Sequence, residues 1–184
     1  MDVEDIVVGI IDASGGELHG RTYLQKVTYF AAKRLGVQAG FEAHYYGPYS
    51  RRVSAEADSL VSRGILSEVR EDFGAHGSPG DEQVRYTYQL TPEDGKRYLE
   101  FLRAIPGSVG PELAQCVNQI RSTGADYRQL SCAAKIDHIL TAAGGRITRK
   151  RAKEEAQKLG WRLSDSDIET AVTILAKLGL IKRR

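Results

Sequence analysis

The chain has 184 residues, of which 41 % are hydrophobic and 27 % are charged, as in ordinary soluble globular proteins. Its net charge of +2 is too small to indicate nucleic-acid binding by itself. No apolar run approaches the roughly 20 residues that span a bilayer, and the acidic N-terminus lacks the basic region of a signal peptide. The two cysteines, Cys116 and Cys132, are expected to be buried thiols. We therefore expect a cytoplasmic protein without membrane association.

Two amphipathic helices are predicted in the first part of the chain. Apolar residues recur at helical spacing over residues 3–13, and Ser14-Gly15-Gly16 ends that pattern. A second apolar stripe covers residues 23–35 and is closed by Gly36. Residues 18–21, between the two helices, are interpreted as a short connector.

An aromatic segment follows the second helix. Residues 41–46 alternate with period two and are rich in aromatic side chains, which predicts a strand. Gly47-Pro48 predicts a turn, because glycine adopts unusual dihedral angles and proline fixes its own φ. Ser50 is expected to cap a third helix that ends at Arg63-Gly64.

Two further strands are predicted after this helix, over residues 65–72 and 84–90. The segment between them, residues 74–81, holds three glycines and a proline and is expected to be the mobile tip of a hairpin. Helices followed by a two-stranded wing predict an α+β fold that is mainly α, with a winged-helix lobe over residues 1–105.

A linker is predicted at residues 105–110, where proline and glycine are concentrated. Before it, Thr91 is expected to be the N-cap of a helix that has Pro92 at its first position and Asp94 as the capping-box acid. After it, residues 111–184 are expected to form a helical lobe that packs against the first one.

This second lobe is expected to resemble a helix-turn-helix without a wing. A helix is predicted over residues 127–143, and Thr148 is expected to cap the next one. Ser164 and Asp167 form a capping-box pattern that opens a last helix, ended by Gly179.

Two segments of the sequence carry a resemblance to a known family. The first, Gly20-Arg21-Thr22, Leu24-Gln25-Lys26 and Tyr29-Phe30, runs from the predicted connector into the second predicted helix. The second, Phe41, Ala43 and Tyr45-Tyr46-Gly47-Pro48-Tyr49-Ser50, follows that helix. This pattern resembles the YwgA-like proteins of bacteria and archaea, and is distantly similar to the SocA-like (Panacea) antitoxin domains. The first resemblance implies a fold, and the second implies an antitoxin or adaptor role through protein contacts. Neither implies catalytic residues.

An aromatic and basic surface is one candidate binding site. It would combine Tyr45, Tyr46 and Tyr49 with Arg51 and Arg52. Tyrosines stack on bases, and arginines pair with phosphates or carboxylates. The alternative is that the tyrosines pack the segment against the helices and the arginines begin a solvated helix.

The densest basic cluster is the second candidate. Arg146, Arg149, Lys150 and Arg151 stand at the start of a predicted helix, where the helix dipole also favours anions. The alternative is a solvated face that nearby glutamates balance.

The sequence predicts no catalytic residues, no cofactor and no metal site. Glu42 and His44 would share one face of a strand, but neither a nucleophile nor a substrate cradle accompanies them. The first hypothesis is a non-enzymatic DNA-binding transcriptional regulator that binds double-stranded DNA. The alternative hypothesis is a protein-interaction module, antitoxin-like or an adaptor, without direct DNA binding. A homodimer is left open.

Overall fold

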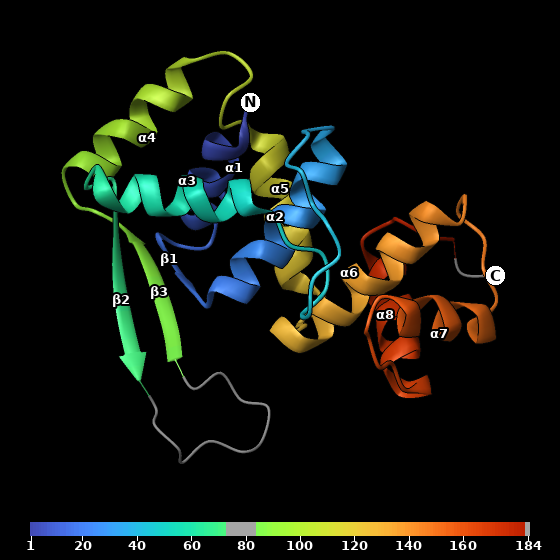
Figure 1. Cartoon of the computed structure of the whole chain (residues 1–184). Helices are drawn as coiled ribbons and strands as arrows, with labels where there is room; N and C mark the ends of the chain where they lie inside the picture. The colour runs from blue at the N-terminus through green and yellow to red at the C-terminus, as the bar shows by residue number, and fades with distance from the viewer. Residues whose placement is uncertain (73–83, 183–184) are drawn as a thin grey trace.

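The computed structural model describes residues 1–72 and 84–182 (Figure 1). The described part is mainly helical with a small antiparallel sheet, which confirms the predicted α+β class. Its elements, in chain order, are α1 (Val3–Ala13), β1 (Glu17–His19), α2 (Arg21–Leu35), α3 (Arg51–Ser62), β2 (Leu66–Asp72), β3 (Val84–Leu90), α4 (Asp94–Ala104), α5 (Pro111–Ser122), α6 (Tyr127–Ala142), α7 (Arg149–Lys158) and α8 (Asp165–Lys177).

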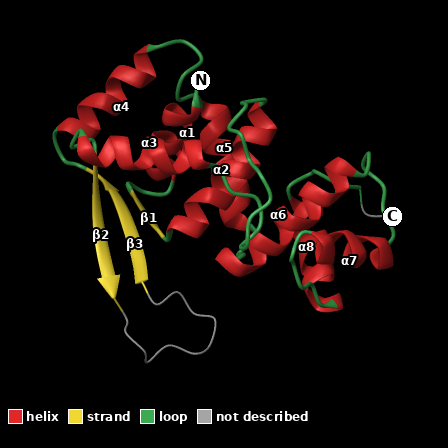
Figure 2. Ribbon diagram, in the orientation of Figure 1, coloured by secondary structure: helices red, strands yellow, loops and turns green. Residues whose placement is uncertain are grey.

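The sheet has three antiparallel strands in the order β1-β3-β2 (Figure 2). The interpretation of residues 18–21 as a connector was therefore wrong, because Leu18 lies opposite Tyr88 in the β1–β3 ladder. A strand of three residues is too short to show the alternation that predicts strands. The expected hairpin tip at residues 74–81 lies outside the described residues.

The predicted strand over residues 41–46 is also wrong. This segment makes one isolated antiparallel bridge, between Glu42 and Tyr49, and then turns at Tyr45 and Tyr46. The Gly47 amide closes the turn by donating to the His44 carbonyl at 2.9 Å. The segment lies beside α2 and α6 instead of pairing with the sheet, so a ladder of strand hydrogen bonds does not form.

Three of the predicted helix starts are confirmed by their caps. The side chains of Ser50 and Thr148 accept hydrogen bonds from backbone amides of α3 and α7, and Ser164 and Asp167 form a complete capping box on α8. These caps depend on residues three positions apart, which is why the local sequence predicts them.

The start of α4 differs from the prediction. Helix α4 begins at Asp94, and its N-cap residue makes no capping bond. Thr91 nevertheless serves the same helix, because its hydroxyl accepts from the Gly95 amide at 2.8 Å and donates to the Gly64 carbonyl at 2.8 Å. The hydroxyl thus joins α4 to the turn that ends α3, and the helical conformation begins later than the proline suggested.

One buried apolar cluster extends from Val3 in α1 to Leu178 after α8. Helix α5 packs against α1 and α2, and α6 packs against α2 and α8. The core therefore contains residues from both sides of the predicted linker at 105–110, while the division into two lobes stays a prediction. A smaller cluster forms around the buried Trp161.

Both cysteines are free thiols, and only Cys116 is fully buried. Burial raises the pKa of the half-buried Cys132 thiol to about 11, so the thiol stays protonated at neutral pH. No helix within the described ranges has the length and apolar character needed to cross a membrane. In the same ranges, no three His, Cys, Asp or Glu side chains gather into a group that could hold a metal ion.

Candidate functional site

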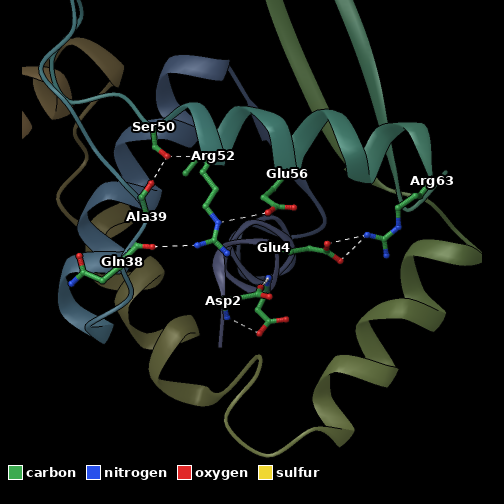
Figure 3. A network of polar contacts seen from close by, with 10 residues as sticks. Asp2, Glu4, Gln38, Ala39, Ser50, Arg52, Glu56 and Arg63 are labelled. Carbon is green, nitrogen blue, oxygen red and sulfur yellow. Dashed lines mark hydrogen bonds and ion pairs between the residues drawn. The ribbon is translucent and has the colours of Figure 1, made fainter.

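The segment between α2 and α3 is held in place by two side chains of α2. The Gln25 side chain makes two hydrogen bonds with the backbone of Ser50, at 2.9 and 3.0 Å. The neighbouring Lys26 donates from Nζ to the Pro48 carbonyl at 2.6 Å. Figure 3 shows that the Ser50 hydroxyl bonds in turn to the carbonyl of Ala39, which closes the segment at its base.

The C-terminal helices contact the same segment from the other side. Gly47 has a φ of +95°, and a Cβ atom there would lie 3.1 Å from Lys135 Cγ and 3.3 Å from the Ser131 carbonyl oxygen of α6. Trp161 Nε1 donates to the His44 carbonyl at 2.6 Å. Glycine is thus required at the turn both for its dihedral angle and for the close approach of α6.

A largely buried polar group joins α2 to α6. The Tyr29 hydroxyl donates to Asp137 at 2.7 Å, and Lys33 Nζ donates to the same carboxylate at 2.5 Å. Burial and the adjacent carboxylate raise the pKa of Tyr29, so its hydroxyl stays a donor. The residues that carry the family resemblance therefore act, in large part, to hold the turn and to join the two halves of the core.

The aromatic part of the first predicted site is on the surface. Tyr45 is 72 % exposed and Tyr46 is 56 % exposed, and their rings meet edge to face with centroids 4.8 Å apart. Tyr49 is half-buried, with its ring 5.0 Å from that of His44. Large exposed aromatic side chains are common at binding surfaces, whereas the half-buried Tyr49 fits the packing interpretation.

Of the two arginines in this site, one is already paired within the protein. Arg51 is exposed, whereas Arg52 pairs with Glu56 at 3.7 Å and also donates to the Gln38 carbonyl at 3.5 Å (Figure 3). At the other end of α3, Arg63 pairs with Glu4 of α1 at 2.9 Å.

Acidic side chains also stand on α3 and next to it. Arg21 of α2 reaches Asp58 of α3 at 3.7 Å and Glu68 of β2 at 2.8 Å. Helix α3 begins with Arg51 and Arg52 and carries Glu56 and Asp58 further along, so it does not present a uniformly positive face.

The second predicted site, the basic cluster, is partly neutralised by α8. Arg149 lies 3.1 Å from Glu169 and 3.9 Å from Asp165, and Lys153 lies 2.9 Å from the same aspartate. The hydrogen bond from Lys153 lowers the pKa of Asp165, which keeps this carboxylate ionised. The remaining members, Arg146, Lys150 and Arg151, are exposed.

The two predicted sites lie on different elements: one on the segment between α2 and α3 and the start of α3, the other at the start of α7. The cluster stands at the first residues of α7, while Trp161, which contacts the turn, follows the other end of that helix. Ten helical residues separate these ends by about 15 Å.

An open groove of about 1190 Å³ lies beside the basic cluster. It runs between α6, the start of α7, α8 and the chain after α8. Its apolar lining comes mainly from Ile136, Leu140, Ile147, Ile168, Val172, Ile174, Leu180 and Ile181, and its basic lining from Arg146, Arg149, Lys177 and Lys182. The acidic side chain of the lining, Glu169, is the one that Arg149 pairs with.

The sequence analysis did not predict this groove. Three of its apolar lining residues, Ile147, Val172 and Ile181, are only partly buried. Apolar spacing predicts which face of a helix turns inward, but it does not indicate whether neighbouring elements fill the space against that face.

The fold and these contacts define a mainly helical protein with a small antiparallel sheet. Its Tyr-Gly-Pro turn is held between two halves of the structure, α1 to α4 on one side and α5 to α8 on the other. The chain is 34 % identical over 89 residues to the uncharacterized protein YwgA of Bacillus subtilis strain 168. The match covers 48 % of this chain and 49 % of YwgA, so it spans about half the length of that relative. It supports the resemblance to YwgA-like proteins. No family model matches the chain.

Proposed function

We propose that α1 to β3 form a winged helix. The order α1-β1-α2-α3-β2-β3, with a sheet ordered β1-β3-β2, supports this assignment. In that arrangement α3 takes the place of the second helix of a helix-turn-helix, and β2 and β3 form the wing. The long segment between α2 and α3, clamped by Gln25 and Lys26, replaces the short turn that usually joins these helices.

We further propose that the protein is a protein-interaction module that binds an acidic amphipathic helix of its partner. The groove beside α8 carries this proposal, because it combines an apolar floor with basic side chains along its lining. Amphipathic helices bind such grooves through apolar residues at positions i, i+3, i+4 and i+7. Acidic residues beside that stripe would meet Arg146 and Lys177, which favours association and fixes the orientation.

Two other features support this proposal over DNA binding. Arg52 and Arg149, two of the predicted contacts, are already paired with carboxylates, which leaves fewer charges to neutralise phosphates. The distant similarity to SocA-like antitoxin domains also suggests a role through protein contacts.

The proposal can be tested with synthetic helical peptides. One labelled peptide of about 18 residues would carry leucines at i, i+3, i+4 and i+7 flanked by glutamates, and a second would carry lysines in their place. We expect the acidic peptide to bind the protein at least ten-fold more tightly in fluorescence anisotropy. The double variant Arg146→Glu/Lys177→Glu should remove or reverse this preference.

A matched control is the variant Lys96→Glu/Arg162→Glu, which makes the same change of net charge at exposed positions outside the groove. It should bind like the parent. Equal binding of the two peptides by the parent would contradict the proposal. So would a stable homodimer, measured by light scattering, that the groove variant dissociates, because the groove would then hold a second copy.

DNA binding is the second candidate, and the winged-helix order of elements favours it. Arg51 is exposed at the start of α3, where this fold meets DNA. The test is anisotropy with a labelled random duplex at ~50 mM salt, where even non-specific binders register at tens of micromolar protein. An absence of binding there would exclude this candidate.

A further inference from the structure

A small cavity lies beneath the Tyr-Gly-Pro turn, apart from the groove, and shares no lining residue with it. Its volume of about 140 Å³ corresponds to roughly five water molecules at ~30 Å³ each, enough for one small polyatomic ion. It is bounded by the first turns of α2, the start of α3, Tyr88 of β3 and the turn itself. At its rim, Arg21, His44 and Tyr46 are exposed, so solutes can reach it.

Several hydrogen-bond donors line this cavity, among apolar side chains such as Leu24 and Val53. Its titratable side chains are Arg21, Lys26, His44, Tyr46, Tyr49 and Tyr88, and its other polar side chains include Thr22 and Ser54. Among the residues that the structure describes, no carboxylate lines it. Glu68 and Asp58, which pair with Arg21, lie outside the lining. A site with cations and hydroxyls but without acids is complementary to an anion.

Among these side chains, Lys26 gives the strongest indication of an anion site. Its side chain is 1 % exposed, yet its one hydrogen bond goes to a neutral carbonyl, that of Pro48, rather than to a carboxylate. Burying an ammonium group without a counter-ion is costly. Burial, together with the nearby positive charge of Lys135, lowers the pKa of Lys26 to about 7. A bound anion would supply the missing counter-charge.

The start of α2 adds a second feature. Its N-cap, Gly20, makes no side-chain capping bond, and its first turn has no acidic residue. Arg21 and Thr22 of this turn line the cavity, so the positive end of the helix dipole lies at its border.

We propose that this cavity binds a tetrahedral oxyanion, either a free ion or the phosphate group of a small metabolite, with Lys26 as its principal cation. The hydroxyls of Thr22 and Ser54 are the neighbouring donors in the lining. Since the anion would contact the turn that α6 and Trp161 also hold, its binding stabilises the connection between the two halves.

Calorimetry with defined ions tests this proposal. Sulfate, inorganic phosphate and glycerol 3-phosphate are titrated into the protein at constant ionic strength, with acetate as the planar anion. We expect tetrahedral anions to bind with millimolar or tighter affinity, and acetate at least ten-fold more weakly. Tighter binding of glycerol 3-phosphate than of the inorganic ions would identify a phosphorylated metabolite as the source; equal binding would identify the free ion.

The variant Lys26→Met should abolish binding, while Lys96→Met, an exposed lysine on α4, should leave it unchanged. If Lys26→Met does not fold, the parent alone decides the question. Sulfate does not titrate near neutral pH, so its binding at pH 8.5 should take up close to one proton on Lys26, and far less at pH 6. Absence of sulfate binding up to ~20 mM, or binding without proton uptake at pH 8.5, overturns the proposal.

Discussion

At the scale of single residues, Lys26 contributes to the dependence of stability on pH above pH 7. The pKa of Lys26 falls from 10.5 in a model lysine to about 7 in the fold, chiefly through burial. Between these two values the unfolded chain binds more protons than the folded protein, so the free energy of unfolding rises with pH. Below about pH 7 both states are protonated and this dependence disappears.

We therefore expect the free energy of unfolding to increase from pH 7 to pH 9 in anion-free buffer, by at most about 1.4 kcal/mol per pH unit. Urea denaturation at half-unit pH steps measures this increase. In Lys26→Met the increase should be largely lost, whatever the variant's absolute stability. If the stability of the unmodified protein falls over this range, Lys26 is not buried without a counter-ion as described.

Gly47 provides the second prediction at this scale. Gly47→Ala adds a methyl group at a φ of +95° against Lys135 and the Ser131 carbonyl, and should cost about 2–4 kcal/mol. Gly124→Ala is the matched control, because its φ is also positive but nothing lies within 4 Å of the added carbon. It should cost about 1 kcal/mol. If the two variants lose the same stability in thermal or urea denaturation, α6 shifts to make room for the added methyl group at Gly47.

At the scale of elements, the contact between α2 and α6 depends on a buried carboxylate. Tyr29→Phe removes a hydrogen bond to Asp137, which is 3 % exposed, and hydrogen bonds to charged groups contribute about 1.5–3 kcal/mol. We expect a loss of about 2 kcal/mol in urea denaturation. Tyr127→Phe, at the start of α6 and away from this carboxylate, is the control and should lose much less.

Some elements could be predicted from the sequence and others could not. Helices and their caps were predictable because they depend on residues that are close in sequence, such as Ser164 and Asp167 in the capping box of α8. The strand β1 was not, because three residues carry no periodicity. The conformation of residues 41–46 was not predictable either, since Trp161, which contacts it, lies 117 positions from His44 in sequence.

The candidate sites show the same division. The sequence identified Arg146 and Arg149 as a basic cluster, and the structure places both in the lining of the groove. It did not indicate that Arg149 is paired with acids of α8, because such a pair depends on tertiary packing. For the same reason, the burial of Lys26 could not be predicted from its helical position alone.

At the scale of the whole molecule, the continuous core predicts cooperative unfolding. The chain has one tryptophan, Trp161, which is buried in the C-terminal half and bonded to His44. Its fluorescence and the far-UV circular dichroism of all the helices should therefore change at the same urea concentration. Two separated transitions would show instead that the predicted lobes on either side of residues 105–110 unfold independently.

The bond between Trp161 and His44 also bears on the order in which the chain folds during synthesis. A ribosome adds residues from the N-terminus, so α1, α2, α3 and the sheet can assemble before residue 161 has been made. Until then the turn at Gly47 lacks its contacts with Lys135 and Trp161. In the newly made N-terminal half the turn at Gly47 is thus held only by α2, until α6 to α8 add their contacts. We expect these long-range contacts to form late in folding, so weakening them should accelerate unfolding more than it slows folding.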